Sequence, residues 1–282
     1  GTVWDAIVVG GGAAGLMCAW TAAARGRKVL LLEHNASVGE KIRISGGGRC
    51  NFTNTGAVPA RYVSENPRFC YSALSRYGPK DFIALVERHG IAYHEKKLGQ
   101  LFCDGTAMQI IEMLVSELRA AGGELCTECR VNGVARHGEG FRLDTSRGEF
   151  HAWALVVASG GLSIPALGVS SLAYDLAAQY AVPVIPTRPA LVPFTWNAED
   201  TAKWSDLSGV SFQCIARTDG PEFREQGLFT HKGLSGPAIL QVSSYWREGG
   251  ALHLNLDPDR KLLPYLLEAK RQGKKAELRS IL

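Results

Sequence analysis

The stretch Asp5-Ala-Ile-Val-Val-Gly-Gly-Gly-Ala-Ala-Gly15 decides the fold of this 282-residue chain. A short apolar run, typical of a buried parallel strand, leads directly into the pattern Gly10-x-Gly12-x-x-Gly15. An alanine-rich helical segment follows to about Arg25, and Lys28–Glu33 is a second apolar run that ends in an acid. This order predicts a βαβ unit of the kind that binds dinucleotides.

The glycines of this pattern have separate physical tasks. Gly10 permits the tight turn, Gly12 lets backbone amides approach a pyrophosphate, and Gly15 allows the helix to pack closely on the strand. Ala14 lies in the first helical turn, where N–H groups and the helix dipole favour phosphate. Glu33 is expected to accept hydrogen bonds from an adenosine ribose, which favours FAD or NAD over NADP.

A glycine- and arginine-rich loop, Glu40–Asn54, favours FAD. Its glycine amides can approach a flat ring or a diphosphate, and its basic side chains can neutralise phosphates. Arg43 is a candidate contact to an anionic substrate. The candidate cofactor-binding residues of the loop are Lys41, Ser45, Gly46, Gly47, Arg49, Cys50 and Asn51.

A later strand is expected to pass close to the same cofactor. Leu155–Ala158 is apolar and ends in small residues, of which Ser159 and Gly160 are candidate contacts. Glu124–Ala152 reads as a meander of short strands, like the small insertion of flavoproteins with two dinucleotide folds, where Val131 would offer its backbone to adenine. The predicted fold class is therefore α/β: a Rossmann-like, FAD-binding, three-layer domain with a small β-meander insertion.

A second domain is expected after a proline-rich crossing. Four prolines lie between residues 183 and 193, and strand-like alternation follows them. We expect a FAD-binding domain over 1–188 and a β-rich substrate domain over 189–282 that is truncated in a basic helix, Lys261–Leu282. Asn66-Pro67 predicts the start of another helix, with Asn66 as its N-cap.

Composition excludes several classes of protein. A chain with 46% hydrophobic and 21% charged residues is neither a disordered tail nor a coiled coil. No apolar run is long enough to span a bilayer, and no secretion signal begins the chain, so we expect a cytoplasmic protein without a membrane partner. The seven scattered cysteines are expected to be reduced. The pattern does not predict an oligomeric state.

The net charge of +4 is concentrated near the C-terminus. Residues 260–282 contain seven Lys or Arg and two Glu. Such a segment is compatible with nucleic acid or an anionic membrane surface, and the alternative is a solvated helix face.

Four segments resemble the bacterial aminoacetone-oxidase-like family of FAD-dependent flavoproteins: Gly10–Gly15, Ile44–Asn54, Leu155–Pro165 and Leu228–Leu240. The resemblance implies FAD, NADH or NADPH as transient electron donor, and a longer chain whose C-terminal part returns to the flavin. The segment His94–Asp104 resembles the enterobacterial branch, which implies reduction of a uridine of large-subunit ribosomal RNA to dihydrouridine. Other members act on small molecules, so ribosomal RNA and a small-molecule substrate both stay open.

Reduction of a C=C bond also needs an acid that delivers a proton. Cys103 is the first candidate, as an exposed thiol on an irregular segment; its alternative is a small buried hydrophobe. His231, in the polar loop Thr230–Gly236, is the second; its alternative is a turn-stabilising histidine.

Cys126 and Cys129 suggest a redox pair or half of a zinc site. A lone CxxC lacks two zinc ligands, so no metal is expected. Residues three apart on a strand point to opposite faces, which argues against a redox pair unless a turn intervenes. Three functions therefore compete: a flavin reductase of RNA, a flavin enzyme of a small metabolite, and a non-catalytic dinucleotide-binding protein.

Overall fold

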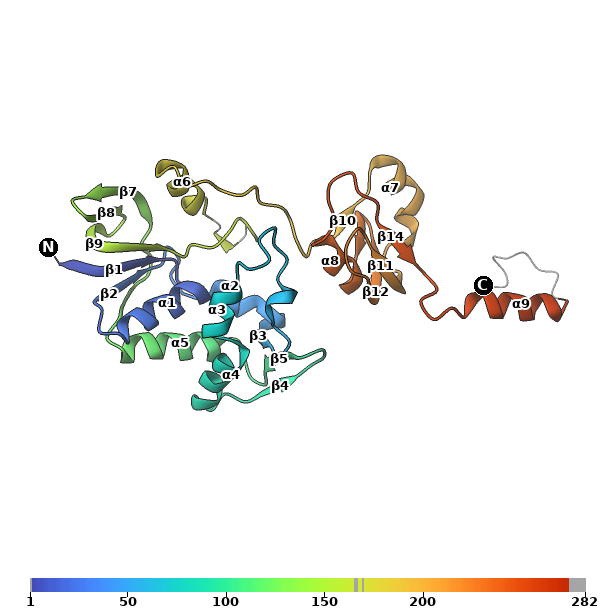
Figure 1. Ribbon diagram of the computed structural model, residues 1–282, viewed down its shortest axis with the longest axis horizontal. Helices are drawn as coiled ribbons and strands as arrows, with labels where there is room; N and C mark the ends of the chain where they lie inside the picture. The colour runs from blue at the N-terminus through green and yellow to red at the C-terminus, as the bar shows by residue number, and fades with distance from the viewer. Residues whose placement is uncertain (1, 165–166, 169, 274–282) are drawn as a thin grey trace. The chain divides into compact units, whose positions relative to one another are not determined.

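The computed structural model describes residues 2–164, 167–168 and 170–273. The chain divides into two compact units, Gly1–Ile185 and Pro186–Leu282 (Figure 1). The break falls in the proline-rich crossing, slightly before the expected boundary at residues 188 and 189.

A six-stranded sheet, in the order β6-β2-β1-β9-β8-β7, forms the centre of the first unit. Four of its strands run parallel: β6 (Glu124–Cys126), β2 (Val29–Leu32), β1 (Val3–Val9) and β9 (Gly148–Val157). Of the meander predicted over Glu124–Ala152, β7 (Val131–His137), β8 (Gly140–Thr145) and the first half of β9 are antiparallel neighbours. The first strand of that range, β6, instead pairs parallel with β2 in the main sheet. The apolar run at Leu155 is no separate strand, because β9 continues from the meander into the parallel sheet.

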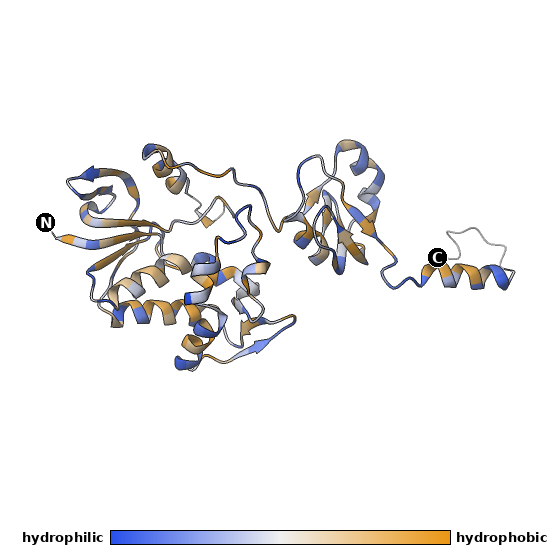
Figure 2. Ribbon diagram, viewed as in Figure 1, coloured by the Kyte–Doolittle hydropathy of each residue, from blue (hydrophilic) through white to orange (hydrophobic). Residues whose placement is uncertain are grey.

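Both faces of the parallel strands are covered, which explains their unbroken apolar sequences. In β1, Val8 packs with α1 (Ala13–Ala23) and α5 (Met108–Ala120), whereas Ile7 and Val9 point to the opposite core. That second core contains residues of the meander and of α6 (Leu172–Gln179). Figure 2 shows the apolar colour of these strands and helices. The arrangement confirms the three-layer α/β expectation.

A smaller antiparallel sheet lies beside this core, in the order β3-β5-β4. Its strands are β3 (Asn51–Asn54), β5 (Gln100–Cys103) and β4 (Tyr93–Glu95). The neighbouring helices are α2 (Glu40–Ile44), the short 3-10 turns η1 (Ser45–Gly48) and η2 (Pro59–Arg61), α3 (Tyr71–Arg76) and α4 (Pro79–Arg88).

The helix start predicted at Asn66 is wrong. The Asn66 side-chain oxygen accepts the Arg68 N–H at 3.1 Å, which makes a local turn, and α3 begins only at Tyr71.

The second unit is β-rich, as expected. Its antiparallel sheet has the order β10-β13-β12-β11-β14, formed by β10 (Phe194–Thr195), β13 (Gly233–Ser235), β12 (Phe223–Thr230), β11 (Ser211–Arg217) and β14 (His253–Asn255). The helices are α7 (Ala198–Trp204), η4 (Ser205–Leu207), α8 (Pro237–Ser243) and α9 (Leu262–Arg271). Ile239 and Val242 of α8 are fully buried against the sheet. Of the predicted basic helix, residues 274–282 lie outside the described residues.

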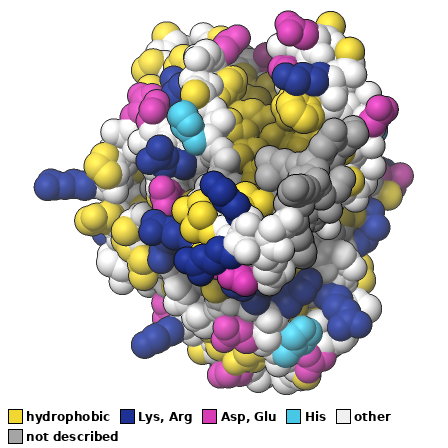
Figure 3. Space-filling view, turned by 90° about the vertical axis from the view of Figure 1, so that its right-hand side faces the viewer, with side chains coloured by type: hydrophobic (Ala, Val, Ile, Leu, Met, Phe, Trp, Pro, Cys, Tyr) yellow, Lys and Arg dark blue, Asp and Glu magenta, His cyan; other side chains and the backbone are white. Residues whose placement is uncertain are grey.

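Hydrophobic side chains remain on the surface beside lysine and arginine side chains (Figure 3). Within the described part of the chain, none of the helices combines the length and apolarity that crossing a bilayer requires.

We expect Leu114→Ala to lower the free energy of unfolding of the first unit by about 2–5 kcal/mol, because the side chain is 2% exposed between α5 and α1. Met108→Ala on the same helix removes a side chain that is 40% exposed and should cost less than about 1 kcal/mol. Hydrogen exchange read by mass spectrometry, resolved by peptide, checks both variants. Equal loss of protection in both variants would contradict the assignment of this core.

Candidate functional site

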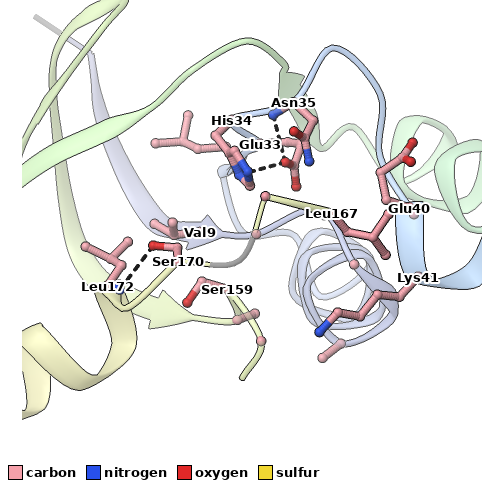
Figure 4. A pocket seen from close by; sticks show the side chains of 18 of the residues that line it. Val9, Glu33, His34, Asn35, Glu40, Lys41, Ser159, Leu167, Ser170 and Leu172 are labelled. Atoms are coloured by element: carbon pink, nitrogen blue, oxygen red, sulfur yellow. Dashed lines mark hydrogen bonds and ion pairs between the residues drawn. The ribbon is translucent and has the colours of Figure 1, made fainter. Parts of the chain in front are cut away.

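A cavity of about 330 Å³ opens at the carboxyl ends of β1, β2 and β9 (Figure 4). Ligands of open parallel sheets bind at this edge, and the volume lies within the usual range for small-molecule sites. The lining includes eight residues predicted to contact a cofactor: Gly10, Gly12, Ala14, Glu33, Lys41, Val131, Ser159 and Gly160.

The glycine turn leaves no space for side chains at two of its positions. A Cβ on Gly10, whose φ is +111°, would overlap the carbonyl of Ala158, and a Cβ on Gly15 would overlap the carbonyl of Gly10. Gly12 differs, because no protein atom lies within 4 Å of the position of its Cβ. Gly12 is also the N-cap of α1 and supplies no capping side chain, so the first N–H groups of the helix face a ligand position.

Glu33 connects the end of β2 to this turn. Its carboxylate accepts the Gly11 N–H at 2.7 Å and the Asn35 N–H at 2.9 Å, and the His34 ring nitrogen Nδ1 lies 3.0 Å away (Figure 4). The residue is buried yet lines the cavity. A carboxylate has about four lone-pair positions, so capacity for a ligand hydroxyl remains.

Two buried polar atoms of the cavity lining have no partner among the described residues: Ser159 Oγ and His34 Nε2. Buried polar atoms are nearly always hydrogen-bonded, and each unpaired atom costs about 1–3 kcal/mol. A polar ligand would supply the missing partners. The open position beside Gly12, the free amides of α1 and these two atoms all fit the adenosine diphosphate part of a dinucleotide.

A second cavity, of about 500 Å³, also borders the start of α1 and shares Lys41 and Ala14 with the first. Besides Lys41, three predicted loop residues line it, Ser45, Cys50 and Asn51, together with the aromatic side chains of Phe52, Tyr77 and Phe82. The Lys41 ammonium donates to Ser163 Oγ at 2.8 Å.

The triple-glycine loop adopts a conformation that other residues disfavour. Gly46, Gly47 and Gly48 have φ values of 59°, 68° and 85°. The Gly48 carbonyl accepts the Ala107 N–H at 2.7 Å, and the Arg49 carbonyl accepts the Cys103 N–H at 2.9 Å. Gly46, Gly47 and Arg49 are exposed and line neither cavity, so their cofactor contacts stay a prediction.

Arg43 is engaged within its own helix. Its guanidinium donates three hydrogen bonds to the two carboxylate oxygens of Glu40, and the shortest of them is 2.5 Å. This hydrogen bond is the main cause that lowers the pKa of Glu40. A substrate anion would have to compete with Glu40 for the arginine, which weakens the expectation that Arg43 contacts substrate.

The expectation of an exposed Cys103 thiol is wrong. Cys103 is the last residue of β5, the central strand of the small sheet, and its exposed fraction is 0%. Burial, first of all, and the nearby Cys50 raise the pKa of the thiol to about 11. Cys103 therefore packs as a small hydrophobic residue, the alternative considered for it.

His231 lies in the second unit, in the turn between β12 and β13, and it is exposed. The hydroxyl of Thr230 accepts the Gly233 N–H at 3.1 Å and the Lys232 N–H at 3.3 Å. The hydroxyl of Thr230 therefore closes the turn.

Cys126 and Cys129 are on a turn rather than a single strand. β6 ends at Cys126, and Glu128 between the two cysteines has a φ of 50°. The neighbouring Cys129 thiol adds to burial in raising the pKa of Cys126, so the two thiols are adjacent. Among the described residues, no group of three or more His, Cys, Asp or Glu side chains could hold a metal ion.

Sequence reasoning missed part of the first cavity. His34 and Asn35 follow Glu33 directly, and their position at the end of β2 was a usable signal. Leu167, Gly168 and Ser170 join the lining from the segment before α6, and no pattern in the sequence marks them. Gly168 approaches His34 so closely that a Cβ there would lie 2.9 Å from Nε2.

Comparison with known proteins adds family evidence. The model of the HI0933-like protein Rossmann domain matches residues 4–250. A ribosomal RNA dihydrouridine synthase of Escherichia coli is 46% identical over 280 residues, which cover 99% of this chain and 70% of that protein. A 3-dehydro-bile acid delta(4,6)-reductase of Clostridium scindens is 29% identical over 255 residues, 86% of this chain and 60% of that protein. The crystal structure of glycine oxidase from Geobacillus kaustophilus matches with a TM-score of 0.45 at 18% identity, covering 78% of this chain and 64% of that chain.

We expect Gly12→Ala and Gly15→Ala to have different effects. The new methyl group of Gly12→Ala enters the cavity, so the Kd for FAD should rise about tenfold, or about 1.4 kcal/mol, with little change in Tm. Gly15→Ala forces a methyl group against the Gly10 carbonyl and should lower the free energy of unfolding by about 1–3 kcal/mol. Calorimetric titration with FAD and thermal unfolding of the cofactor-free protein check the pair. A Gly12→Ala variant with unchanged FAD affinity would contradict the assignment of this cavity.

We expect Cys103 to resist iodoacetamide at about pH 8 in the native protein, because its pKa of about 11 keeps the buried thiol protonated. The reaction should become faster as pH rises towards 11, and it should be immediate after unfolding in urea. Peptide mass spectrometry of the alkylated protein checks this, with the half-buried Cys70 as internal comparison. Rapid labelling of native Cys103 would restore it as a candidate acid.

Proposed function

The chain belongs to the HI0933-like Rossmann family of FAD-dependent oxidoreductases, and we propose that it reduces uridine to dihydrouridine in 23S ribosomal RNA. The expected family and enzyme class are thereby confirmed, which removes the non-catalytic alternative. The observation that carries the RNA substrate is the 46% identity, along almost the whole chain, to a ribosomal RNA dihydrouridine synthase. The dinucleotide cavity of the first unit supports the cofactor.

In this proposal, the backbone of the first unit holds FAD. The N–H groups at Gly12 and Ala14 bind the pyrophosphate, Glu33 accepts a ribose hydroxyl, and Val131 offers its backbone to adenine. The Ser159 hydroxyl and His34 Nε2 gain the partners that they lack in the protein alone. The positive charge of Lys41 lies between the two cavities, where it can offset phosphate charge.

When bound, FAD supplies the two-electron reduction of the C5=C6 bond of uracil, with NADH or NADPH proposed as the electron donor. The protein has to position the base, exclude water and deliver one proton. With Cys103 buried, His231 is the proton donor that we propose. Its imidazole is exposed on a turn of the substrate unit, and histidine is the commonest general acid.

A small-molecule substrate is the second candidate. It is favoured by the 29% identity to a bile acid reductase, a protein whose name indicates reduction of a small molecule. The two candidates differ in whether RNA is required for oxidation of the reduced protein. An action on ribosomal RNA would place the protein in the cytoplasm, as we propose.

The test uses the full-length protein loaded with FAD. We expect anaerobic NADH or NADPH to bleach the visible flavin band, and ribosomal RNA from a strain lacking the gene to restore it while dihydrouridine forms. Mass spectrometry of nuclease-digested RNA measures the product, and RNA from the parent strain, already modified, is the matched control. Reoxidation by a steroid enone, with no new dihydrouridine in the RNA, would replace the proposal with the small-molecule alternative.

A further inference from the structure

One segment of the first unit, residues 58–77, exposes aromatic side chains that a soluble domain normally buries. Phe69 is 80% exposed, Tyr71 51% and Tyr62 49%. Neighbouring aromatic residues are more covered, because Phe52, Phe82 and Tyr93 are half-buried against the core of the unit. Phe52 packs with Phe82 and Tyr93 at centroid distances of 6.0 Å and 5.5 Å. Concentrated exposure of large apolar side chains marks an interaction surface.

The same segment carries an excess of positive charge. Arg61, Arg68 and Arg76 are exposed, and Glu65 is the one acid in its sequence. Throughout residues 2–164, 167–168 and 170–273, none of the ion pairs involves these three arginines. Their guanidinium groups are therefore available to an anionic partner.

Local contacts bring η2 and the start of α3 together. The Tyr62 N–H bonds to the Pro59 carbonyl at 3.1 Å, which closes the turn η2. The Cys70 thiol lies 3.9 Å from that same carbonyl, and it thereby holds the start of α3 against η2. Arg61, the last residue of η2, and Tyr62 directly after it therefore lie near Phe69 and Tyr71, which flank Cys70.

The chemistry of this surface identifies the class of partner. Exposed aromatic rings interleaved with arginines, with little acidic charge, suit a strand that offers flat bases and a phosphate at every step. A protein partner would match the aromatic rings but would need acidic side chains opposite all three arginines. Charge complementarity and stacking together favour single-stranded nucleic acid.

We propose that residues 58–77 form the surface on which this protein binds single-stranded RNA, with bases stacked on Phe69, Tyr71 and Tyr62 and phosphates contacted by Arg61, Arg68 and Arg76. The surface ends at Tyr77, which lines the second cavity together with Ser45 and Asn51 of the glycine loop. An RNA strand bound on this surface would reach the loop residues that are predicted to contact FAD. This inference rests on the proposed function, because it names how the RNA substrate is held.

The experiment measures binding of a fluorescein-labelled, unstructured RNA oligonucleotide to the full-length holoprotein as a function of salt. Phe69→Ala should weaken binding roughly 5- to 100-fold, and Phe69→Trp should restore it, because stacking needs a flat ring. A variant with all three arginines changed to Gln should lower the slope of log affinity against log salt by about 2. Arg25→Gln with Arg27→Gln removes exposed charge at the far end of α1 and is the matched control. Flavin content and Tm report on folding of each variant.

The possible results test the proposed RNA-binding surface and the proposed function independently of each other. If the surface variants lose RNA affinity while the control variant does not, the surface holds, whether or not the wild-type protein forms dihydrouridine. If the wild-type protein forms dihydrouridine and the surface variants bind RNA and react as it does, the surface is wrong and the proposed function stands. If the variants change only self-association or capture of a ribosomal protein, the surface serves protein contacts and the inference is overturned.

Discussion

The structure depends on the contact between the backbone of the glycine turn and the end of β9. Gly10 lies against Ala158, and Gly15 lies against Gly10, at separations that exclude any Cβ. This approach lets β1, α1 and β9 meet at one point, and the cavity forms directly outside it. The buried bond from the Gly11 N–H to Glu33 then joins the turn to β2. The acid thus has a structural task in addition to the one expected of it towards ribose.

The parts of the fold that were predictable are those with strong local causes. The order of apolar run, glycines, alanine-rich segment and acidic strand end determines the βαβ unit, because each step limits the backbone. The chain divides into its two units within the proline-rich crossing, and the extents expected for the two domains stay a prediction. The prediction of a helix start at Asn66 was wrong because the side chain of Asn66 stabilises a turn as readily as a helix start. The sequence does not show which of the two tertiary packing selects. The expectation for Cys103 was wrong because its side chain is buried in a core formed with residues from other elements, such as Val86 and Leu114, which is a tertiary property.

The residues of the candidate site also fall into those that the sequence could predict and those that it could not. Gly12, Glu33 and Ser159 could be found from the sequence because each lies directly beside a strand end, where the position of the backbone is determined by the sheet. Leu167 and Ser170 reach the cavity through the path of the chain after β9, and no periodicity encodes that path. The positions of the residues expected to bind the cofactor are therefore determined largely by the geometry of the backbone. In the proposed function, the choice of substrate depends on side chains of the surface and of the second unit, where local sequence rules give less information.

The continuity of β9 has a consequence for how this family can vary. One strand carries the meander at its beginning and residues that line the first cavity just beyond its end. Because side chains alternate along a strand, inserting a single residue near Phe150 would exchange the two faces of everything that follows and would turn Ser159 away from the crevice. Changes in length should therefore accumulate in the hairpin turns, such as the one at Gly138–Gly140, while β9 itself keeps a constant number of residues between the hairpin and the crevice.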